Sequence, residues 1–281
     1  MPADASRARL TVRLWGVRGS LPTPRASHLG VGGNTTCVEV RGPEGAVVML
    51  DAGTGARDFG VALAAEVGGA PVDLHVLFSH FHWDHLQGLP FFAPIYGEGN
   101  TLTLHAAAEA EAIEAAMCGQ MGEPFFPVPF RELRATVRVV PVRIGEAFTV
   151  GGMTVRPFPL HHPQGSTGYR FDAEGASFVF ATDYEHGDPE LEAVLVDAAQ
   201  GADVFYSDAQ YTPDEYDLRR GWGHTTWVQA VRLAQKAKVG RLVLAHHDPA
   251  HDDVALERIL AQARERFPAT DLAREGAVMQ W

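Results

Sequence analysis

Four side chains able to bind a metal ion lie within six residues of the chain, in His80-Phe81-His82-Trp83-Asp84-His85. Neutral imidazoles and carboxylates are the ligands that zinc, manganese and iron prefer in proteins. The apolar run Leu74–Phe78 directly precedes this cluster and is typical of a buried strand. The spacing therefore predicts a metal centre on the loop that leaves the strand.

Three further candidate ligands, His162, Asp183 and His246, each follow another short apolar run. Loops at the ends of strands can aim side chains from distant parts of a chain at one point. Each of the three residues alone is compatible with an ordinary turn. Seven ligands together exceed the needs of one tetrahedral ion and suit two ions that share a carboxylate, so the joint pattern predicts a dinuclear site.

The elements that must position these residues are predicted from hydrophobic patterning. Strands are expected where short apolar or alternating runs are bounded by Gly, Pro or Asp, at Leu10–Trp15, Cys37–Val40, Ala46–Leu50, Val72–Ser79, Thr136–Val142, Met153–Phe158, Tyr169–Phe171, Ser177–Ala181, Val204–Ser207 and Leu242–Ala245. Helices are expected at Ala106–Cys118, Pro189–Gln200 with Asp188 as N-cap, Thr225–Val239 and Asp253–Phe267. Many strands with separated helices indicate a layered α/β architecture.

Composition points to one domain over residues 1–281, because no linker or low-complexity run divides the 281-residue chain. Its two cysteines can form neither a disulfide framework nor a four-thiolate zinc site. Residues 1–10 lack the apolar core of a signal peptide, and no apolar run has the length of a membrane span. We therefore expect a cytoplasmic protein without a membrane partner.

The formal net charge of −12 bears on the partner. Affinity for nucleic acids depends largely on Lys and Arg, so this charge argues against a nucleic-acid partner. A small anionic substrate is still compatible with it, because a bound dication can dominate the local field.

The ligand pattern resembles the metallo-β-lactamase superfamily, whose hallmark is His-x-His-x-Asp-His. The resemblance extends from Gly32-Gly33-Asn34-Thr35 to His246. It implies a four-layer αββα sandwich with two divalent metal ions at one edge of the two sheets. Zinc is the expected metal, and manganese and iron stay open because the same ligands serve all three.

The resemblance also implies a role for each ligand. The first ion would be held by His80, His82 and His162, and the second by Asp84, His85 and His246, with Asp183 bridging the two. Asp51 matches an Asp-containing turn of the family and would orient a ligand.

Two ligands lie in histidine doublets. His162 is preferred to His161 because the pattern His-x5-Gly-Tyr is met by His162 and Gly168-Tyr169. His246 is preferred to His247 because it directly follows the predicted strand.

Two further motifs resemble those of the tRNA 3′-end endonuclease tRNase Z. Gly223-His224-Thr225-Thr226 is similar to its His-Ser-Thr motif, and Ser207-Asp208-Ala209-Gln210 to its His-Glu-Ala-Thr motif. In that family the carboxylate orients a histidine that assists departure of the alcohol. The resemblance thus implies catalytic roles for Asp208 and His224, together with Asp84. A plain role at the start of a helix is the alternative for His224.

The short segment between His162 and Asp183 holds no tRNA-clamping arm, and the chain is more similar to relatives that act on small substrates. The leading hypothesis is therefore a metal-dependent hydrolase of a small phosphodiester, such as a cyclic nucleotide or cyclic ribose phosphate. Lactone, ester or β-lactam hydrolysis is an alternative, with Tyr184 as a candidate residue. A tRNA 3′-processing endonuclease, a non-catalytic scaffold and a di-iron oxidoreductase are further alternatives.

Three features have no single interpretation. Segments 89–96 and 121–130 are rich in aromatic residues and proline, and they form either a wall of the site or a packing or dimer contact. Arg18 is a candidate phosphate contact. A homodimer is an expectation from the family alone.

Overall fold

The computed structural model describes residues 9–281, so most of the segment on which the signal-peptide expectation rests lies outside the described residues. Two seven-stranded sheets lie at the centre of the described part. The first contains, in spatial order, β14 (Val278–Gln280), β1 (Thr11–Gly16), β2 (Cys37–Arg41), β3 (Val47–Leu50), β4 (Asp73–Leu77), β5 (Thr101–Ala106) and β6 (Thr136–Pro141). The second contains β13 (Thr270–Leu272), β12 (Arg241–Ala245), β11 (Val204–Asp208), β10 (Ala176–Ala181), β9 (Ser166–Ala173), β8 (Met153–Leu160) and β7 (Phe148–Val150).

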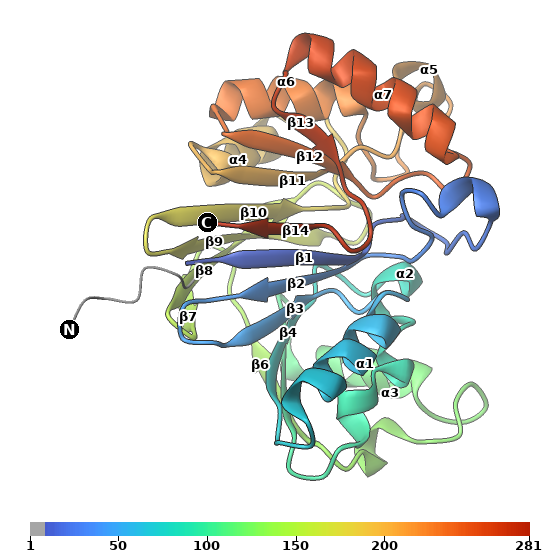
Figure 1. Cartoon of the computed structure of the whole chain (residues 1–281), viewed down its shortest axis with the longest axis vertical. Helices are drawn as coiled ribbons and strands as arrows, with labels where there is room; N and C mark the ends of the chain where they lie inside the picture. The colour runs from blue at the N-terminus through green and yellow to red at the C-terminus, as the bar shows by residue number, and fades with distance from the viewer. Residues whose placement is uncertain (1–8) are drawn as a thin grey trace.

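Helices cover the outer face of each sheet (Figure 1). The first sheet carries α1 (Ala56–Val67) and α3 (Ala110–Gln120), and the second carries α4 (Pro189–Ala199), α6 (Trp227–Ala237) and α7 (Asp253–Arg266). Single turns complete the described elements: η1 (Ala26–His28), α2 (Trp83–Leu86), η2 (Leu89–Phe91), η3 (Ala93–Tyr96), η4 (Phe130–Glu132) and α5 (Pro213–Tyr216). The predicted αββα sandwich is confirmed.

Strand β3 shows why the layers stack in this way. All four of its residues are buried. Val48 and Leu50 belong to the core that includes the second sheet, whereas Val47 and Met49 belong to the core under α1 and α3. Because successive side chains of a strand point to opposite faces, an entirely apolar strand fits a sheet that is covered on both sides.

Parallel pairing brings the ends of distant strands together. In the first sheet β3, β4 and β5 run parallel. In the second, β10, β11 and β12 run parallel, and β8 points the same way because it is antiparallel to β9, which is antiparallel to β10. The carboxyl ends of these strands therefore meet at one edge of the sandwich, where loops can carry a shared site.

Some sequence predictions were wrong in detail. The Ala- and Glu-rich segment Ala106–Cys118 was expected to be helical from its start, but Ala106 ends β5 and the helix begins at Ala110. Pairing with β4 and β6 thus outweighs the high helix propensity of alanine at that residue. Helix α1, which runs through Gly60, was not predicted. Asp188 caps α4 as expected, accepting from the amides of Glu190 and Leu191.

The aromatic segments serve partly as packing. Phe92 and Ile95 are buried in the core under α1, and the rings of Phe92 and Phe59 lie 5.7 Å apart. Phe91 and Phe125 are exposed instead.

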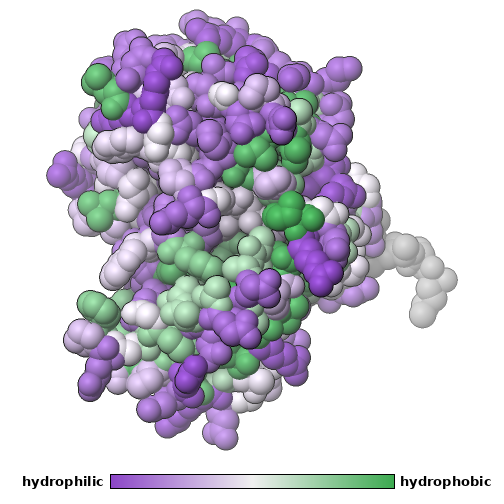
Figure 2. All heavy atoms as spheres, turned by 180° about the vertical axis from the view of Figure 1, so that it is seen from behind, coloured by the Kyte–Doolittle hydropathy of each residue, from purple (hydrophilic) through white to green (hydrophobic). Residues whose placement is uncertain are grey.

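On the face turned away from the viewer in Figure 1, hydrophobic residues gather in the middle and are surrounded by hydrophilic ones (Figure 2). Among the described residues, no helix combines the length and the apolar character needed to span a membrane.

Candidate metal centre and active site

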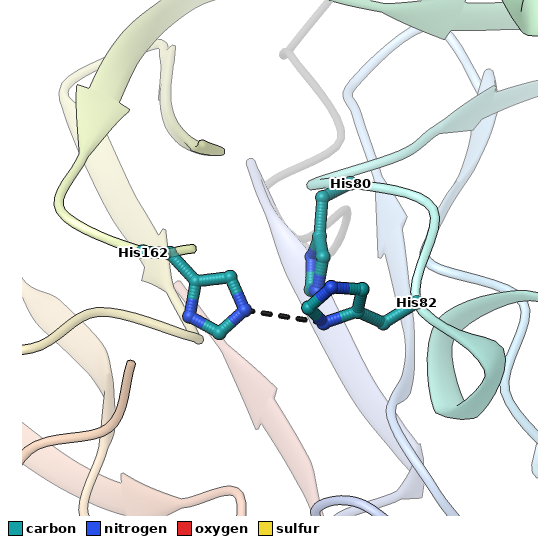
Figure 3. Close-up of side chains that lie close together, drawn as sticks. All are labelled: His80, His82 and His162. Carbon is teal, nitrogen blue, oxygen red and sulfur yellow. Dashed lines mark hydrogen bonds between the residues drawn. The ribbon is translucent and has the colours of Figure 1, made fainter. Parts of the chain in front are cut away.

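Three histidines from two loops meet at the edge of the sandwich. His80 and His82 follow β4, and His162 approaches them from the end of β8 (Figure 3). One ligand atom of each residue lies within 4.8 Å of the others. The ring centroid of His80 lies 4.3 Å from that of His82 and 4.7 Å from that of His162. This is the first predicted ligand group, brought together as the sequence indicates.

Hydrogen bonds decide which nitrogen of each ring faces the centre. The other ring nitrogen donates a hydrogen bond in every case: His80 Nδ1 to Ser79 Oγ at 3.0 Å, His82 Nε2 to Gln164 Oε1 at 3.1 Å, and His162 Nδ1 to the carbonyl of Gly223 at 2.8 Å. With these nitrogens as donors, His80 Nε2, His82 Nδ1 and His162 Nε2 point into the group, where His82 Nδ1 and His162 Nε2 lie 3.2 Å apart, the contact drawn as a dashed line in Figure 3.

The second predicted group also assembles, with ligand atoms of Asp84, His85, Asp183 and His246 within 4.8 Å of one another. His85 Nδ1 donates to Asp51 at 2.8 Å, and His246 Nδ1 donates to Gln210 at 2.8 Å. The Nε2 atoms of both rings therefore face the carboxylates. The Asp51 side chain also accepts hydrogen bonds from the amide and hydroxyl of Ser79. Because Ser79 contacts His80 of the first group, Asp51 connects the two groups.

Asp183 lies between the two groups. Its Oδ1 is 3.9 Å from the Nε2 atoms of both His80 and His162, and its Oδ2 is 3.1 Å from the Nε2 atoms of both His85 and His246. One oxygen thus faces each group, which is the arrangement that a bridging carboxylate requires.

The donor set fits two divalent metal ions. The Nε2 atoms of His80 and His85 are buried and have no hydrogen-bond partner among the described residues. Two ligands that each lie about 2.1 Å from one ion are themselves about 3 to 3.5 Å apart, which is close to the observed spacing of the second group. Ligand roles for these residues stay a prediction, and the geometry is compatible with it.

The pKa values of the histidines differ between the groups. Burial, with the nearby positive charge of His85, holds the pKa of His80 well below its usual range, and burial also lowers that of His162. Burial alone would lower the pKa of His246 as well, but Asp183 and Asp84 outweigh it and raise that pKa to about 9. Metal binding at the second group must therefore displace protons.

Three residues of the site have left-handed backbone conformations: Asp51, Asp183 and His246, with φ of 56°, 57° and 55°. Each directly follows, or nearly follows, the end of a strand. Such conformations are strained by roughly 1 kcal/mol or more for residues other than glycine and persist where the surroundings fix them. The turn redirects each side chain from the strand towards the centre.

Glycine is needed at position 19 because the backbone there passes close to a candidate ligand. A Cβ on Gly19 would lie 2.4 Å from His246 Nδ1.

A carboxylate–histidine pair adjoins the second group. Asp208 ends β11, and its Oδ2 accepts from His224 Nδ1 at 3.0 Å. Its Oδ1 accepts from the amides of Gln210 and Thr225. His224 Nδ1 lies 3.7 Å from Asp183 Oδ1. With Nδ1 engaged, Nε2 of His224 is left to exchange a proton with a bound molecule. Helix α6 has Thr226 as its N-cap, so His224 does not serve that purpose.

Comparison with known proteins agrees with this geometry. The family model for the β-lactamase superfamily domain matches residues 47–247. The chain belongs to this superfamily.

One relative and two structural neighbours match over nearly the whole chain. Ribonuclease Z of Bradyrhizobium sp. (strain ORS 278) is 24% identical, over 92% of this chain and 96% of its own length. The metallo-β-lactamase fold protein YhfI from Bacillus subtilis matches with a TM-score of 0.72 and 17% identity, over 97% and 99% of the two chains. A diphosphatase from the PhnP family matches with a TM-score of 0.69 and 21% identity, over 97% and 98%. The chain is thus a metallo-β-lactamase superfamily hydrolase related to ribonuclease Z, and the family implies divalent metal ions.

Other candidate residues of this superfamily member lie outside the groups. His247 is buried, and its Nε2 donates to the carbonyl of Ala273, so His246 is the member of the doublet that faces the site. His161 is exposed and belongs to neither group.

Two expectations were wrong. Arg18 is fully buried, and its guanidinium donates to main-chain carbonyls, including those of Gly32 and His251, so it cannot contact a phosphate. Tyr184 is buried too, with its hydroxyl paired with Ser207 Oγ at 2.8 Å, which removes it as a substrate contact.

Proposed function

We propose that the protein is a dinuclear metal-dependent phosphodiesterase that acts on a small substrate, a cyclic nucleotide or related cyclic phosphate. The observation that carries the proposal is the Asp208–His224 pair beside Asp183. An alkoxide that leaves a phosphodiester needs a proton, and the imidazole of His224 lies beside the site where it can supply one.

Two divalent ions, zinc in our proposal, would be held by the two histidine groups with Asp183 between them. When bound, they would supply positive charge beside a phosphoryl group and activate a water molecule. The protein's own residues hold these groups in place. Asp51 and Gln210 orient His85 and His246, and the amide of Ser20 donates to Asp84 at 2.7 Å.

Asp208 orients His224 by accepting a hydrogen bond from its Nδ1. The carboxylate is buried and holds Nδ1–H, so Nε2–H of the imidazolium can be donated to the departing oxygen. The proton and the alcohol leave together, and His224 is then reprotonated from solvent. Asp84 supports this arrangement as a buried carboxylate between His85 and His246.

The short connection after His162 supports a small substrate. The residues between His162 and Asp183 are occupied by β9 and β10, which leaves no room for an RNA-clamping insertion there. A second candidate is tRNA 3′-end cleavage, which the ribonuclease Z relative favours. Lactone hydrolysis is less favoured because Tyr184 is buried and engaged.

The test combines metal analysis with activity on one sample. Two metal ions per chain are expected, together with turnover of bis(p-nitrophenyl) phosphate and of 2′,3′- or 3′,5′-cyclic nucleotides that a chelator abolishes. His162→Ala should lose metal and activity, while His161→Ala, the adjacent exposed residue, should retain both. Turnover of a precursor tRNA or a lactone without turnover of any small phosphodiester would refute the proposal.

A further inference from the structure

A cavity of about 390 Å³ adjoins the first histidine group, and His80 and His82 form part of its lining. Its other walls come from the segment Ala106–Ala108 after β5, from Ile144, and from the turn between β8 and β9. The cavity thus lies between the two sheets, on the side of the first group. His224 does not line the cavity, and its ring lies 5.4 Å from that of His162.

The walls are suited to an uncharged group. Phe81, Ile144, Pro159 and Leu160 contribute apolar surface, and none of the lining residues that the structure describes is Asp, Glu, Lys or Arg. A ligand pocket with mostly apolar walls and a few polar groups binds the organic body of a small molecule, because apolar burial supplies affinity and the polar groups supply orientation. A phosphate or carboxylate inside it would have no charged partner other than the histidines at its edge.

Gln164 supplies a polar group at the edge of the cavity. Its Oε1 accepts from His82 Nε2, and its amide nitrogen makes no hydrogen bond to any residue within 9–281. Gln164 is exposed in the turn before β9, with φ of 67° in the left-handed region, and its hydrogen bond to His82 places the side chain beside that histidine. The free NH₂ group can donate to a carbonyl oxygen or ring nitrogen of a ligand.

We propose that this cavity binds the nucleobase of the substrate, while the phosphodiester lies at the first histidine group. The inference rests on the proposed function and narrows it, because a cyclic ribose phosphate has no base to place there. The volume lies near the lower end of the range for small-molecule pockets, which suits one nucleoside rather than a polynucleotide. Gln164 then connects recognition of the base with the orientation of His82.

The test compares two substrates with the same reacting bonds: 2′,3′-cyclic AMP, and the 2,3-cyclic phosphate of methyl β-riboside, which has a methyl group in place of the base. Wild-type protein should prefer the nucleotide by about tenfold or more in kcat/KM, the scale of a lost apolar contact. Ala107→Trp places an indole at an exposed part of the lining and should remove this preference, because KM rises more for the nucleotide than for the methyl riboside.

Val254→Trp, on the exposed face of α7, is the matched control, and equal metal content and melting temperature confirm that the variants fold. Gln164→Leu should lower the preference without abolishing it. Equal use of both substrates by wild type, or an unchanged preference in Ala107→Trp, overturns the inference while the proposed function stands.

Calorimetric titration with 2′,3′-cyclic AMP separates the two ideas if nothing is hydrolysed. Binding that is lost in Ala107→Trp and kept in Val254→Trp supports the cavity and refutes the proposed function. Absence of binding to wild type overturns the inference.

Discussion

At the scale of single residues, the pairing of Asp208 with His224 determines where a proton can be delivered. Both oxygens of Asp208 are engaged, one by His224 and the other by two main-chain amides. The carboxylate therefore has no free position for a substrate, and it acts through the imidazole that it orients. His224 is the group whose remaining nitrogen can reach a bound molecule.

Replacement of His224 by alanine should affect substrates according to their leaving groups. For 2′,3′-cyclic nucleotides, whose alkoxide needs a proton, we expect kcat to fall by about 100- to 10,000-fold. For bis(p-nitrophenyl) phosphate, whose nitrophenolate leaves unprotonated, the loss should be less than about tenfold. Steady-state kinetics of both substrates measure the difference, with His161→Ala as the control. An equal loss on both substrates would show that His224 has no role as an acid.

The residues of the site differ in how far the sequence predicted them. The candidate ligands could be predicted because histidines and aspartates at strand ends form a recognisable pattern, and the structure brings them together in two groups. Gln164 and Gln210 were not assigned, because each acts through one hydrogen bond to a ligand and a lone glutamine carries no signal in a sequence. Arg18 was misjudged, because an arginine that binds main-chain carbonyls has the same local sequence as one that binds phosphate.

At the scale of elements, one loop connects the Asp208–His224 pair to the first histidine group. Glu185 accepts hydrogen bonds from the amides of Gly221 and Gly223 at 2.8 and 2.9 Å, and from the hydroxyl of Tyr216 at 2.8 Å. The carbonyl of Gly223 in turn accepts from His162, and His224 follows directly. Glu185 thus holds a loop that positions His162 and His224.

Glu185→Gln should weaken metal binding, because an amide has one acceptor oxygen where the carboxylate has two. We expect a roughly tenfold lower metal affinity, the lower end of the effect of groups that support a ligand. Competition with a chromophoric chelator measures it without reference to activity. Glu190→Gln, an exposed glutamate on α4, should match wild type. The loop has no role in orienting His162 if the two variants bind metal equally well.

A second element-scale prediction concerns β5, the strand that sequence reasoning partly assigned to a helix. Its His105 is buried and stacks on Phe148, with ring centroids 5.4 Å apart. Burial, reinforced by the neighbouring His75, lowers the pKa of His105 to about 4. In the unfolded chain the imidazole of His105 binds a proton below about pH 6.5, whereas in the folded protein it stays neutral until the pH approaches 4. The unfolding free energy is therefore unaffected by this group above about pH 6.5 and falls as the pH decreases towards 4.

His105→Phe keeps the stacked ring and removes the titration. When the pH is lowered from 7 to 4.5, the unfolding free energy of wild type should therefore fall by up to about 3 kcal/mol more than that of the variant. Urea unfolding of chelator-treated protein at both pH values measures the difference and excludes metal release as its cause. Identical pH dependence of the two proteins would contradict the assignment.

At the scale of the whole molecule, each sheet supplies part of the site, so the geometry depends on how the two halves are joined. The segment around Arg18 forms bridges with Thr35 of the first half and His247 of the second. The Arg18 side chain continues the connection, because it donates to the carbonyl of Gly32 at 2.7 Å and to that of His251 at 2.6 Å. A buried guanidinium thus links the two halves next to His246.

Arg18→Met should destabilise the whole protein, because a side chain of similar length leaves buried carbonyls without donors. We expect a loss of about 3 to 5 kcal/mol, as for other buried charged groups whose partners are left unpaired. The urea midpoint should fall with an unchanged m-value.

The control is Arg25→Met, at an exposed arginine on the same loop, whose unfolding free energy should lie within about 0.5 kcal/mol of that of wild type. Arg18→Lys should not restore stability, since an ammonium cannot reach separate carbonyls in the directions of the planar guanidinium. If Arg18→Met proves as stable as Arg25→Met, the two halves must be held in register by the packed sheet faces alone.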